Sequence, residues 1–491
     1  MSEATSQPQS TEAELIAVRR EKLAKLRELG VDPYGARFDI TVSPAELKAD
    51  FTDEKKVTTA GRIIGLRDMG KSVFFQLGDA NGSIQGYLSV KHLDESQSAI
   101  WKCLDRGDWI GVSGETFTTR TGEPTIKVES FTVLSKSLRP MPDKFHGLSD
   151  RETKYRKRHL DLIGNPESAT LFATRSKMIA EIRSFLHERE FLEVETPMLQ
   201  SVAGGAAARP FETHHNALGM PLTLRIAPEL FLKRLLVGGF TKVFELNRNF
   251  RNEGISRRHN PEFTMLEAYW AFSDFEEMAN LVEEMTCHLA EKFCGGLKIE
   301  HKDDEGNVIR TIDLTRPWKR ASYHDLIKEA AGEDFFDLTP EQRVARCEKL
   351  GVQLSDQMED YEVVQQVFEK KVEEHTFNPC FVTRVAKELI PLAKLTPDSN
   401  TVEVYELIIN GQEISPGYSE LNDPDVQRER LEHQAGGEEE QKVDYDFIET
   451  LEHGMPPAGG IGIGIDRLIM MLTGAPTIRD VVLFPLLKKK D

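Results

Sequence analysis

Polar and charged side chains alternate along residues 243–270 (VFELNRNFRNEGISRRHNPEFTMLEAYW), a pattern that predicts two strands around a basic loop. Strand periodicity puts five polar residues on one face of the first strand and its continuation: Glu245, Asn247, Asn249, Arg251 and Glu253. An arginine in such a row offers bidentate hydrogen bonds to a phosphate or a carboxylate. The second strand carries Phe263, Met265, Glu267 and Tyr269 on one face. The stretch therefore predicts an anion-binding loop, and the alternative is an internal Arg–Glu pair within a sheet.

Two carboxylates are expected to meet on a hairpin in residues 401–414 (TVEVYELIINGQEI). The Asn410-Gly411 pair is the strongest short hairpin signal, and a two-residue turn would pair Ile408 with Glu413. Glu406 lies one step along the same face, within side-chain reach. Like charges this close need a proton or a cation, and Mg²⁺ prefers oxygen ligands. The sequence thus predicts a magnesium site, with two solvated glutamates on an edge hairpin as the alternative.

Glycine alternates with isoleucine in residues 459–471 (GGIGIGIDRLIMM) before the pattern becomes helical near Asp466. A strand without side chains at Gly462 and Gly464 admits a ligand or another backbone closely. Arg467 would stand at the start of the helix, where backbone N–H groups favour anions. The pattern predicts a second anion contact, and the alternative is close strand–helix packing with a surface arginine. The G-x-G-x-x-G-like spacing comes too late in the chain to open a dinucleotide-binding domain.

Residues 226–236 (IAPELFLKRLL) predict a helix with Pro228 and Glu229 in its first turn. Glu229 there either stabilises the helix dipole alone or enters a site. Gly204 and Gly205, followed by AAARPF, predict a mobile loop.

The elements that must position these residues fall into distinct stretches. Residues 12–29 predict a helix that stops at Gly30, and five short β-rich runs between residues 57 and 136 predict a small closed barrel of the OB type. Residues 175–191 predict an amphipathic helix, followed by a strand at FLEVETPML. The expected domains are a tail with a helical extension at 1–50, the barrel at 51–140, a linker at 141–165 and a catalytic domain at 166–491, with a helical insertion at about 315–374.

Net charge, apolar runs and cysteine content exclude several classes of protein. The chain has 491 residues and a net charge of −19, which excludes a protein that coats DNA through bulk charge, although basic residues gather at 19–27 and 144–158. The first residues lack the apolar core of a secretory signal, and no apolar run reaches the roughly 18 residues of a membrane helix. Five scattered cysteines without C-x-x-C indicate a reducing compartment. We expect a cytoplasmic protein with neither a membrane nor DNA as partner.

Taken together, these stretches resemble the three motifs of class II aminoacyl-tRNA synthetases, and the resemblance is closest to lysyl-tRNA synthetase. FLEVETPML resembles the dimer-forming first motif, FRNEGISRRHNPEFTMLEAY the second and GGIGIGIDRL the third. The resemblance runs from LRELGVDPY through AGGAAARPFETHHNAL to IRDVVLFPL at the end of the chain. It implies an α+β fold, in which an antiparallel catalytic sheet flanked by helices follows a five-stranded OB-fold barrel, in a homodimer.

The resemblance also implies an activity: lysine and ATP give lysyl-adenylate and pyrophosphate, and lysine then passes to the 3′-hydroxyl of the terminal adenosine of tRNA(Lys). The implied catalytic residues are Arg251 and Arg467. The implied ATP-binding residues are Arg251, Glu253, His259, Asn260, Phe263 and Arg467. The implied lysine-binding residues are Gly205, Glu229, Glu267, Tyr269 and Glu420. Glu406 and Glu413 would hold Mg²⁺, and Arg67, Phe74 and Gln85 would read the anticodon.

Three positions depart from the family pattern. In EISPGYSELND, Pro416 stands where the family often has an asparagine that contacts lysine, and proline brings no donor. In VAKELIPLAKL, Ala386 and Ile390 replace a proline and a serine. Two other interpretations therefore remain: a ligase of the same scaffold with another amino acid or acceptor, and a catalytically silent RNA-binding or regulatory paralogue.

Overall fold

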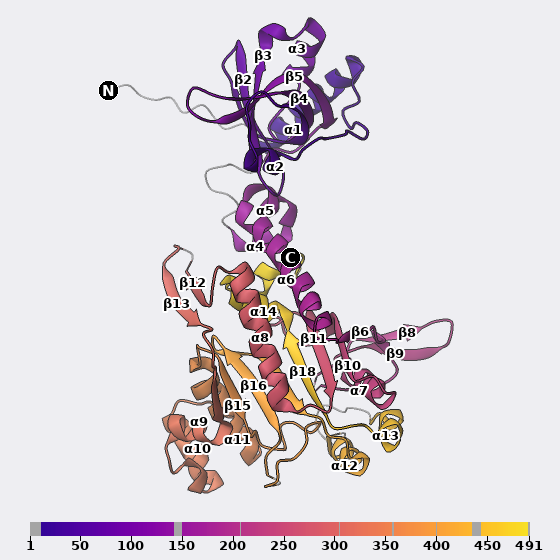
Figure 1. Ribbon diagram of the computed structural model, residues 1–491, viewed down its shortest axis with the longest axis vertical. Coiled ribbons are helices and arrows are strands. Elements are labelled where there is room, and N and C mark those ends of the chain that lie inside the picture. The colour runs from indigo at the N-terminus through magenta and orange to yellow at the C-terminus, as the bar shows by residue number, and fades with distance from the viewer. Residues whose placement is uncertain are drawn as a thin grey trace. The chain divides into compact units, whose positions relative to one another are not determined.

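The computed structural model describes residues 11–141, 150–206, 208–303, 305–355, 358–398, 400–434 and 443–489 (Figure 1). The chain divides into two compact units, Met1–Leu171 and Phe172–Asp491. The tail expected before residue 11 and residues 142–149 of the expected linker lie outside the described residues. None of the helices in the described ranges is long and apolar enough to cross a membrane.

The first unit contains the expected five-stranded closed barrel, with strand order β1-β2-β3-β5-β4. Its strands alternate between buried and more exposed residues, and the inward side chains, such as Ile63, Phe75 and Ile110, form the core. The strands are β1 (Lys56–Asp68), β2 (Ser72–Gly78), β3 (Ser83–Ser89), β4 (Trp109–Thr118) and β5 (Pro124–Ser135). Helices α2 (Pro44–Ala49) and α3 (Glu95–Lys102) complete the barrel region.

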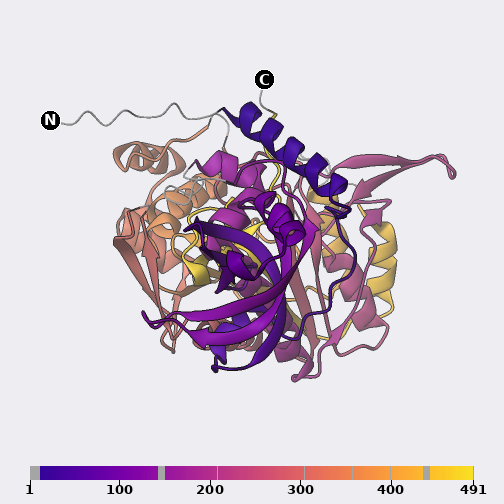
Figure 2. The same ribbon diagram turned by 90° about the horizontal axis from the view of Figure 1, so that it is seen from above.

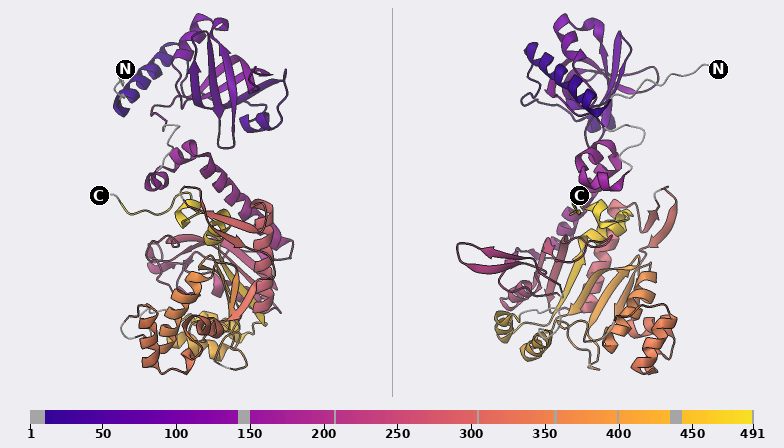
Figure 3. Two further views of the ribbon diagram at one scale, coloured as in Figure 1. Left: turned by 90° about the vertical axis from the view of Figure 1, so that its left-hand side faces the viewer. Right: turned by 180° about the vertical axis from the view of Figure 1, so that it is seen from behind.

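Helix α1 (Glu12–Glu28) runs along the outside of the barrel (Figures 2 and 3). Thr11 and Glu14 form a capping box at its start, and Gly30 follows its end with a positive φ of 73°. Its Arg19 guanidinium donates hydrogen bonds to the backbone carbonyls of Arg106, Ser137 and Arg139, so the helix is tied to the segments just before β4 and just after β5. Two short helices, α4 (Arg151–Arg156) and α5 (Arg158–Gly164), follow the barrel.

The second unit is organised by an eight-stranded sheet of order β14-β15-β16-β17-β18-β11-β10-β6. Its pairs are antiparallel except β14–β15 and β10–β6. The strands are β6 (Leu192–Glu193), β10 (Lys242–Phe250), β11 (Glu262–Ala271), β14 (Lys319–Ser322), β15 (Cys380–Thr383), β16 (Val404–Ile409), β17 (Gln412–Ser419) and β18 (Ala458–Gly464). This matches the expected antiparallel catalytic sheet.

Helix α8 (Phe275–Phe293) lies across one face of this sheet (Figure 1). A Cβ added to Gly459 would meet α8 at Asp274 and Met278, whereas one added to Gly460 would point to the opposite face. That opposite face carries α7 (Glu229–Val237) and the residues expected to bind ligands. The other helices of the unit are α6 (Pro166–His187), which begins in the first unit, α12 (Pro424–Gln434), α13 (Tyr445–Glu452), α14 (Ile465–Thr473) and α15 (Ile478–Val481).

The stretch expected as a helical insertion contains α9 (Tyr323–Ala331), α10 (Pro340–Lys349) and α11 (Asp360–Val367), which share a hydrophobic core with β15 and β16. Besides these helices the stretch contains the short strand β14, which pairs with β15 at the edge of the main sheet. The four residues of β14 (KRAS) carry no apolar alternation, so nothing in the sequence marks them as a strand.

The strand expected at FLEVETPML is also shorter than predicted. Only Leu192 and Glu193 pair with β10, and Pro197 has no N–H to continue a ladder. The chain then enters a separate sheet of β7 (Leu199–Gln200), β9 (Met220–Leu224) and β8 (Glu212–His215). The β8–β9 hairpin extends away from the body of this unit (Figures 1 and 3). A last pair, β12 (Lys298–Lys302) and β13 (Val308–Asp313), forms a second hairpin.

Candidate functional site

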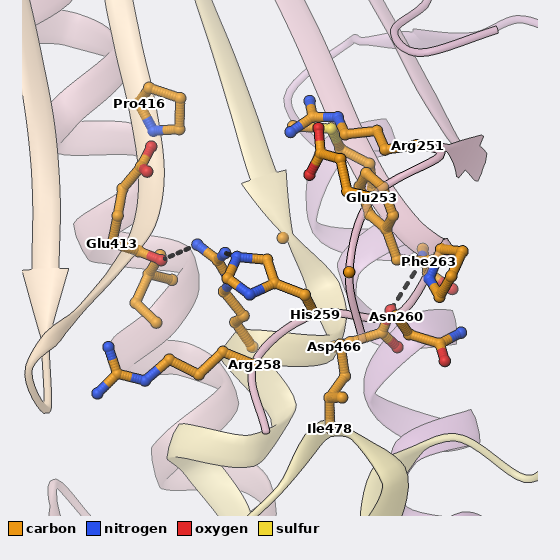
Figure 4. A pocket seen from close by; sticks show the side chains of 17 residues that line it. Arg251, Glu253, Arg258, His259, Asn260, Phe263, Glu413, Pro416, Asp466 and Ile478 are labelled. Atoms are coloured by element: carbon orange, nitrogen blue, oxygen red, sulfur yellow. Dashed lines mark hydrogen bonds between the residues drawn. The ribbon is translucent and has the colours of Figure 1, made fainter. Parts of the chain in front are cut away.

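The first group of expected ligand contacts surrounds a cavity of about 200 Å³ where β10 and β18 end and β11 begins (Figure 4). Glu413 and Pro416 lie on one side of it, and Arg251, Glu253 and Phe263 on the other. All six residues expected to bind ATP line this cavity: Arg251, Glu253, His259, Asn260, Phe263 and Arg467. The structure thus brings together residues that are more than 200 positions apart in the chain.

The alternation predicted that Arg251 continues the face of the first strand. In the structure β10 ends at Phe250, and Arg251 is the next residue. Its N–H donates to the carbonyl of Pro261 at 2.9 Å, which closes the loop between β10 and β11. Its guanidinium lies over the Phe263 ring, 5.2 Å from the centroid, and burial lowers its pKa from the usual value. A buried arginine held by its backbone and by a ring presents its free donors in a fixed direction, which suits an anion in the cavity.

Arg467 lies on the first turn of α14 and is held on two sides. It donates to the carbonyl of Glu413 at 2.9 Å and approaches Nε2 of His259 at 2.9 Å. Burial and the nearby Arg467 lower the pKa of His259, so the ring is neutral at neutral pH and its Nε2 accepts the arginine hydrogen bond. Arg467 therefore links the loop after β10 to the β16–β17 hairpin.

The β16–β17 hairpin has the predicted turn. Asn410 and Gly411 both have positive φ, 56° and 70°, and Ile408 pairs with Glu413. A register shift at Leu407–Ile408 puts Glu406 opposite Pro416. The expected metal ligands thus lie on adjacent strands near the cavity that Glu413 lines.

Two further carboxylates approach this pair from the stretch after α11, in which the sequence indicated no chemistry. Glu373 accepts a hydrogen bond from the N–H of Glu413 at 3.1 Å. Burial, then Glu413, Glu373 and Glu369, raise the pKa of Glu406 to about 8. Because helical propensity alone does not say which residue faces the sheet, no sequence signal could have placed Glu369 and Glu373 here.

The residues fit a hard divalent cation. Within the described ranges, the side chains of Glu406 and Glu413 form neither a hydrogen bond nor an ion pair, and like carboxylates left in this state favour a bound cation. The same ranges contain no cluster of three or more side chains arranged to enclose a metal. Mg²⁺ is commonly held by one or two carboxylates, with water and substrate phosphates completing its shell.

A second group of buried acids lies behind the cavity, between α7, β11 and β17. Glu229 accepts hydrogen bonds from Nζ of Lys233 at 2.7 Å and from the Tyr418 hydroxyl at 2.8 Å. Lys233 also forms an ion pair with Glu420, and its side chain is 0% exposed. Glu229 is therefore part of a charge cluster rather than a dipole contact alone. We call Glu229, Glu267 and Glu420, with Lys233, the acid pocket.

Glu267 is the third carboxylate of the acid pocket. It accepts a hydrogen bond from the Tyr269 hydroxyl at 3.0 Å. Burial and the neighbouring Glu229 raise its pKa to about 8, so Glu267 is mostly protonated at neutral pH when no ligand is present. Burial likewise raises the pKa of Glu420, against the effect of Lys233.

Glycines allow the acid pocket to form. A Cβ at Gly460 would collide with a carboxylate oxygen of Glu420 and come within 2.7 Å of the Tyr269 ring, and one at Gly462 would lie 2.9 Å from Met265. Of the two glycines predicted to admit another group closely, Gly462 does so for the Met265 side chain, whereas a Cβ at Gly464 would make only ordinary contacts from 3.7 Å. Gly205 has a positive φ of 85° and lies against the first turn of α7, next to Glu229.

In the barrel, the expected anticodon-reading residues share the outer face. Arg67 pairs with Phe74 across β1–β2, and Phe74 pairs with Tyr87 across β2–β3. Gln85 lies two residues before Tyr87, and its amide donates to the Thr125 hydroxyl at 2.9 Å. Phe74, Tyr87 and Phe117 form a row of rings with centroids 5.1 and 6.0 Å apart, so the sequence analysis missed two aromatic members of this face.

Comparison with known proteins decides the family. Residues 150–488 match the family described as tRNA synthetases class II (D, K and N). The chain belongs to this family. Residues 57–134 of the synthetase match the OB-fold nucleic acid binding domain. The resemblance and the fold class inferred from the sequence are therefore confirmed.

Curated relatives cover nearly the whole synthetase. A lysine–tRNA ligase of Carboxydothermus hydrogenoformans is 49% identical, over 97% of this chain and 99% of its own. One of Pelotomaculum thermopropionicum is 50% identical, over 97% and 96%. One of Staphylococcus epidermidis is 47% identical, over 96% and 98%.

The three departures from the family pattern fall in different surroundings. Pro416 lines the cavity. Ile390 instead packs against the core of the helical stretch around α9–α11, and Ala386 makes a single β-bridge to Thr401. Of these three residues, only Pro416 faces the cavity. The sequence analysis also missed Arg258, which lines the cavity, and Lys233 and Tyr418, which complete the acid pocket.

Proposed function

We propose that the synthetase is a lysine–tRNA ligase that forms lysyl-adenylate from L-lysine and ATP and then charges tRNA(Lys). The observation that carries this proposal is the acid pocket beside the arginine-lined cavity. Buried carboxylates select a cationic side chain and disfavour an acidic or a neutral one. The names of the relatives in three bacterial genera agree with this specificity.

In the activation step, the carboxylate of lysine attacks the α-phosphorus of ATP, and the bond to the bridging oxygen of pyrophosphate breaks. We assign Arg251 to the α-phosphate and the attacking carboxylate, and Arg467 to the departing pyrophosphate. Both guanidiniums are held by other groups before a ligand enters, so they stabilise developing charge without reorganising. No covalent enzyme intermediate is needed, because positioning and charge stabilisation carry such chemistry.

The remaining cavity residues are assigned to the nucleotide. Phe263 would stack on the adenine, and Glu253, His259 and Asn260 would help to orient the base and phosphates. Gly205, Glu229, Glu267, Tyr269 and Glu420 would receive lysine. Glu406 and Glu413 would hold Mg²⁺, which when bound neutralises phosphate charge and makes pyrophosphate a better leaving group.

The acceptor is assigned to tRNA because the barrel carries Arg67, Phe74 and Gln85 on one face. Stacking of bases on aromatic side chains together with hydrogen bonds to their edges is how OB-folds bind single-stranded RNA. We also propose a cytoplasmic homodimer whose interface includes the first motif. Leu192 and Leu199 of that motif are 45% and 50% exposed, as expected of apolar residues that a second copy covers.

A second candidate is a ligase of the same scaffold with another amino acid, and Pro416 favours it. A proline at the cavity wall cannot donate a hydrogen bond to an amino-acid substrate. The silent-paralogue interpretation is weaker, since Arg251, Arg467 and Glu413 line one cavity and Glu406 lies opposite Pro416, which also lines it.

Amino-acid-dependent exchange between ATP and pyrophosphate, without tRNA, separates these candidates. Exchange with lysine alone supports the ligase proposed here and makes Pro416 a tolerated change. Exchange with a different amino acid supports the second candidate. Absence of exchange with every amino acid, while tRNA still binds, supports a silent paralogue.

A further inference from the structure

Lys233 is the charged residue of the acid pocket that the sequence analysis did not assign. It lies one helical turn after Glu229 on α7, so the Glu–Lys pair at i,i+4 follows from helix geometry. The contact with Glu420 is different, because Glu420 lies on the segment after β17, 187 residues away. Lys233 therefore joins two carboxylates that come from separate elements of the fold.

The burial of this lysine is complete. Its side chain is 0% exposed, and those of Glu229 and Glu420 are 5% and 1% exposed. The Tyr418 ring lies 5.6 Å from Nζ, and the Tyr418 hydroxyl donates to Glu229. An ammonium in such a place is held in one geometry and cannot leave without exposing two unpaired carboxylates.

The acid pocket has more carboxylates than cations, so it carries a net negative charge. Three carboxylates and one ammonium leave two negative charges when all four groups are ionised. A diamino acid brings two ammonium groups, and its carboxylate would face Arg251. The charges then cancel only for a ligand with a side-chain ammonium in addition to its α-ammonium. Without Lys233, the same ligand would leave one buried carboxylate unpaired.

We propose that Lys233 is a specificity-determining residue of the amino-acid pocket: by pairing with Glu229 and Glu420 it sets the number of unpaired carboxylates that the substrate must neutralise. This inference rests on the function proposed above and deepens it. Lys233 acts through the acids and contacts no reacting atom, so it is a positioning residue.

Glu267 is the carboxylate of the acid pocket whose protonation should respond to a bound ammonium, since it has no cation at ion-pair distance within the described residues. The charged groups near Glu267 come from several elements. Glu245 on the neighbouring strand β10 pairs with Arg225 at 2.6 Å, and Gly462 on β18 brings no charge. The groups that act on it are Glu229, Tyr269, Tyr418, Arg251 and Arg225.

Protons and the ligand ammonium therefore compete for the acid pocket. With the pKa of Glu267 at about 8 in the empty site, the KM for lysine should fall as pH rises from 6 to about 8 and then level off. Removing Lys233 takes away a cation that lowers the pKa of Glu420, so protons compete more strongly for the pocket and the fall in KM moves to higher pH.

The test measures exchange with lysine and with norleucine, which lacks the side-chain ammonium, between pH 6 and 9. For Lys233→Met we expect the KM for lysine at pH 7 to rise roughly ten-fold or more, because one pKa unit corresponds to a factor of ten. The preference for lysine over norleucine should fall by a similar factor. For Lys233→Arg, which keeps the positive charge, the KM for lysine should fall over the same pH range as in the unaltered enzyme.

Arg234→Met is the matched control, because Arg234 is the next residue on α7 and pairs with Asp444 at 2.7 Å outside the pocket. Arg234→Met should leave unchanged both the pH dependence of the KM for lysine and the preference for lysine over norleucine. Suppose that Lys233→Met folds and exchanges lysine, with the same dependence of KM on pH and the same preference for lysine over norleucine as the unaltered enzyme. The inference is then overturned while the proposed function stands. Absence of exchange with lysine in the unaltered enzyme would instead overturn the proposed function.

A measurement on the unaltered protein covers the case in which Lys233→Met does not fold. Titration calorimetry of lysine in phosphate and in Tris at pH 7 should show a net release of protons on binding, because the ligand ammonium favours the ionised form of Glu267. Norleucine should release none. Equal proton release by the two ligands would contradict the inference.

Discussion

The carboxylate of Asp466 accepts a hydrogen bond from the backbone N–H of Thr264 at 2.8 Å, although the two residues are 202 positions apart. The same carboxylate pairs with Arg175 of α6 at 2.6 Å. Asp466 therefore fastens the start of α14, and with it Arg467, to the strand that carries Phe263. This side chain therefore helps to set the position of Arg467 relative to Phe263 in the cavity.

Asp466→Asn should lower both stability and exchange. The pair with Arg175 is largely buried, and breaking such a pair costs about 3 kcal/mol. We expect a free energy of unfolding lower by this amount in a denaturant titration, together with a raised KM for ATP. The double variant Arg175→Met/Asp466→Asn should be less destabilised than the sum of the single changes, and strict additivity would contradict the coupling.

Arg251→Ala should reduce ATP–pyrophosphate exchange by at least a hundred-fold, about 2.7 kcal/mol in activation free energy, without unfolding the protein. The arginine is assigned to charge that develops only in the transition state, so the loss should appear in kcat. Arg248→Ala, on β10 shortly before Arg251 but with its side chain 38% exposed, is the control and should exchange normally. Near-normal exchange by Arg251→Ala would refute the assigned role.

Phe74→Ala should weaken tRNA charging and leave exchange without tRNA unchanged. Loss of one stacked base costs about 1–3 kcal/mol, so the KM for tRNA should rise by roughly five- to a hundred-fold. Tyr34→Ala removes an aromatic ring that is 46% exposed outside the barrel strands and should charge tRNA normally. Equal loss of exchange and charging in Phe74→Ala would mean that the residue has a structural role.

The affinity for ATP should depend on the protonation of His259. Its pKa is lowered by burial and by Arg467, so the neutral ring prevails at pH 7 and becomes protonated only as pH falls below its usual range. Protonation removes the acceptor of the Arg467 hydrogen bond, and the KM for ATP should therefore rise in acid. His259→Gln, which does not titrate, should show a flat profile over the same range. A profile like that of the unaltered enzyme would assign the titration elsewhere.

Gly460→Ala should raise the KM for lysine while the KM for ATP stays the same. The added methyl group would displace the Glu420 carboxylate and the Tyr269 ring, both of which belong to the lysine side of the site. Gly164→Ala, where an added Cβ meets nothing within 4 Å, is the matched control. Parallel changes in both KM values would show that β18 itself had moved.

Local pattern was sufficient for much of the fold. The Asn410-Gly411 turn, the pairing of Ile408 with Glu413 and the closed barrel follow from alternation and turn chemistry, which act between residues close in sequence. The short strands β6 and β14 were misjudged, because two to four residues carry too little periodicity to be recognised.

The sequence by itself determined which residue types were present for an ATP-dependent ligase and which hairpins and helices would carry them. Only the tertiary structure decided that Lys233 lies between Glu229 and Glu420, and that Glu369 and Glu373 approach Glu406. These relationships depend on which helix faces pack against which strands, and strand order is set by burial summed over the whole sheet. A buried charge is tolerated only where such packing supplies its partner, so the pocket's charge balance is a property of the fold.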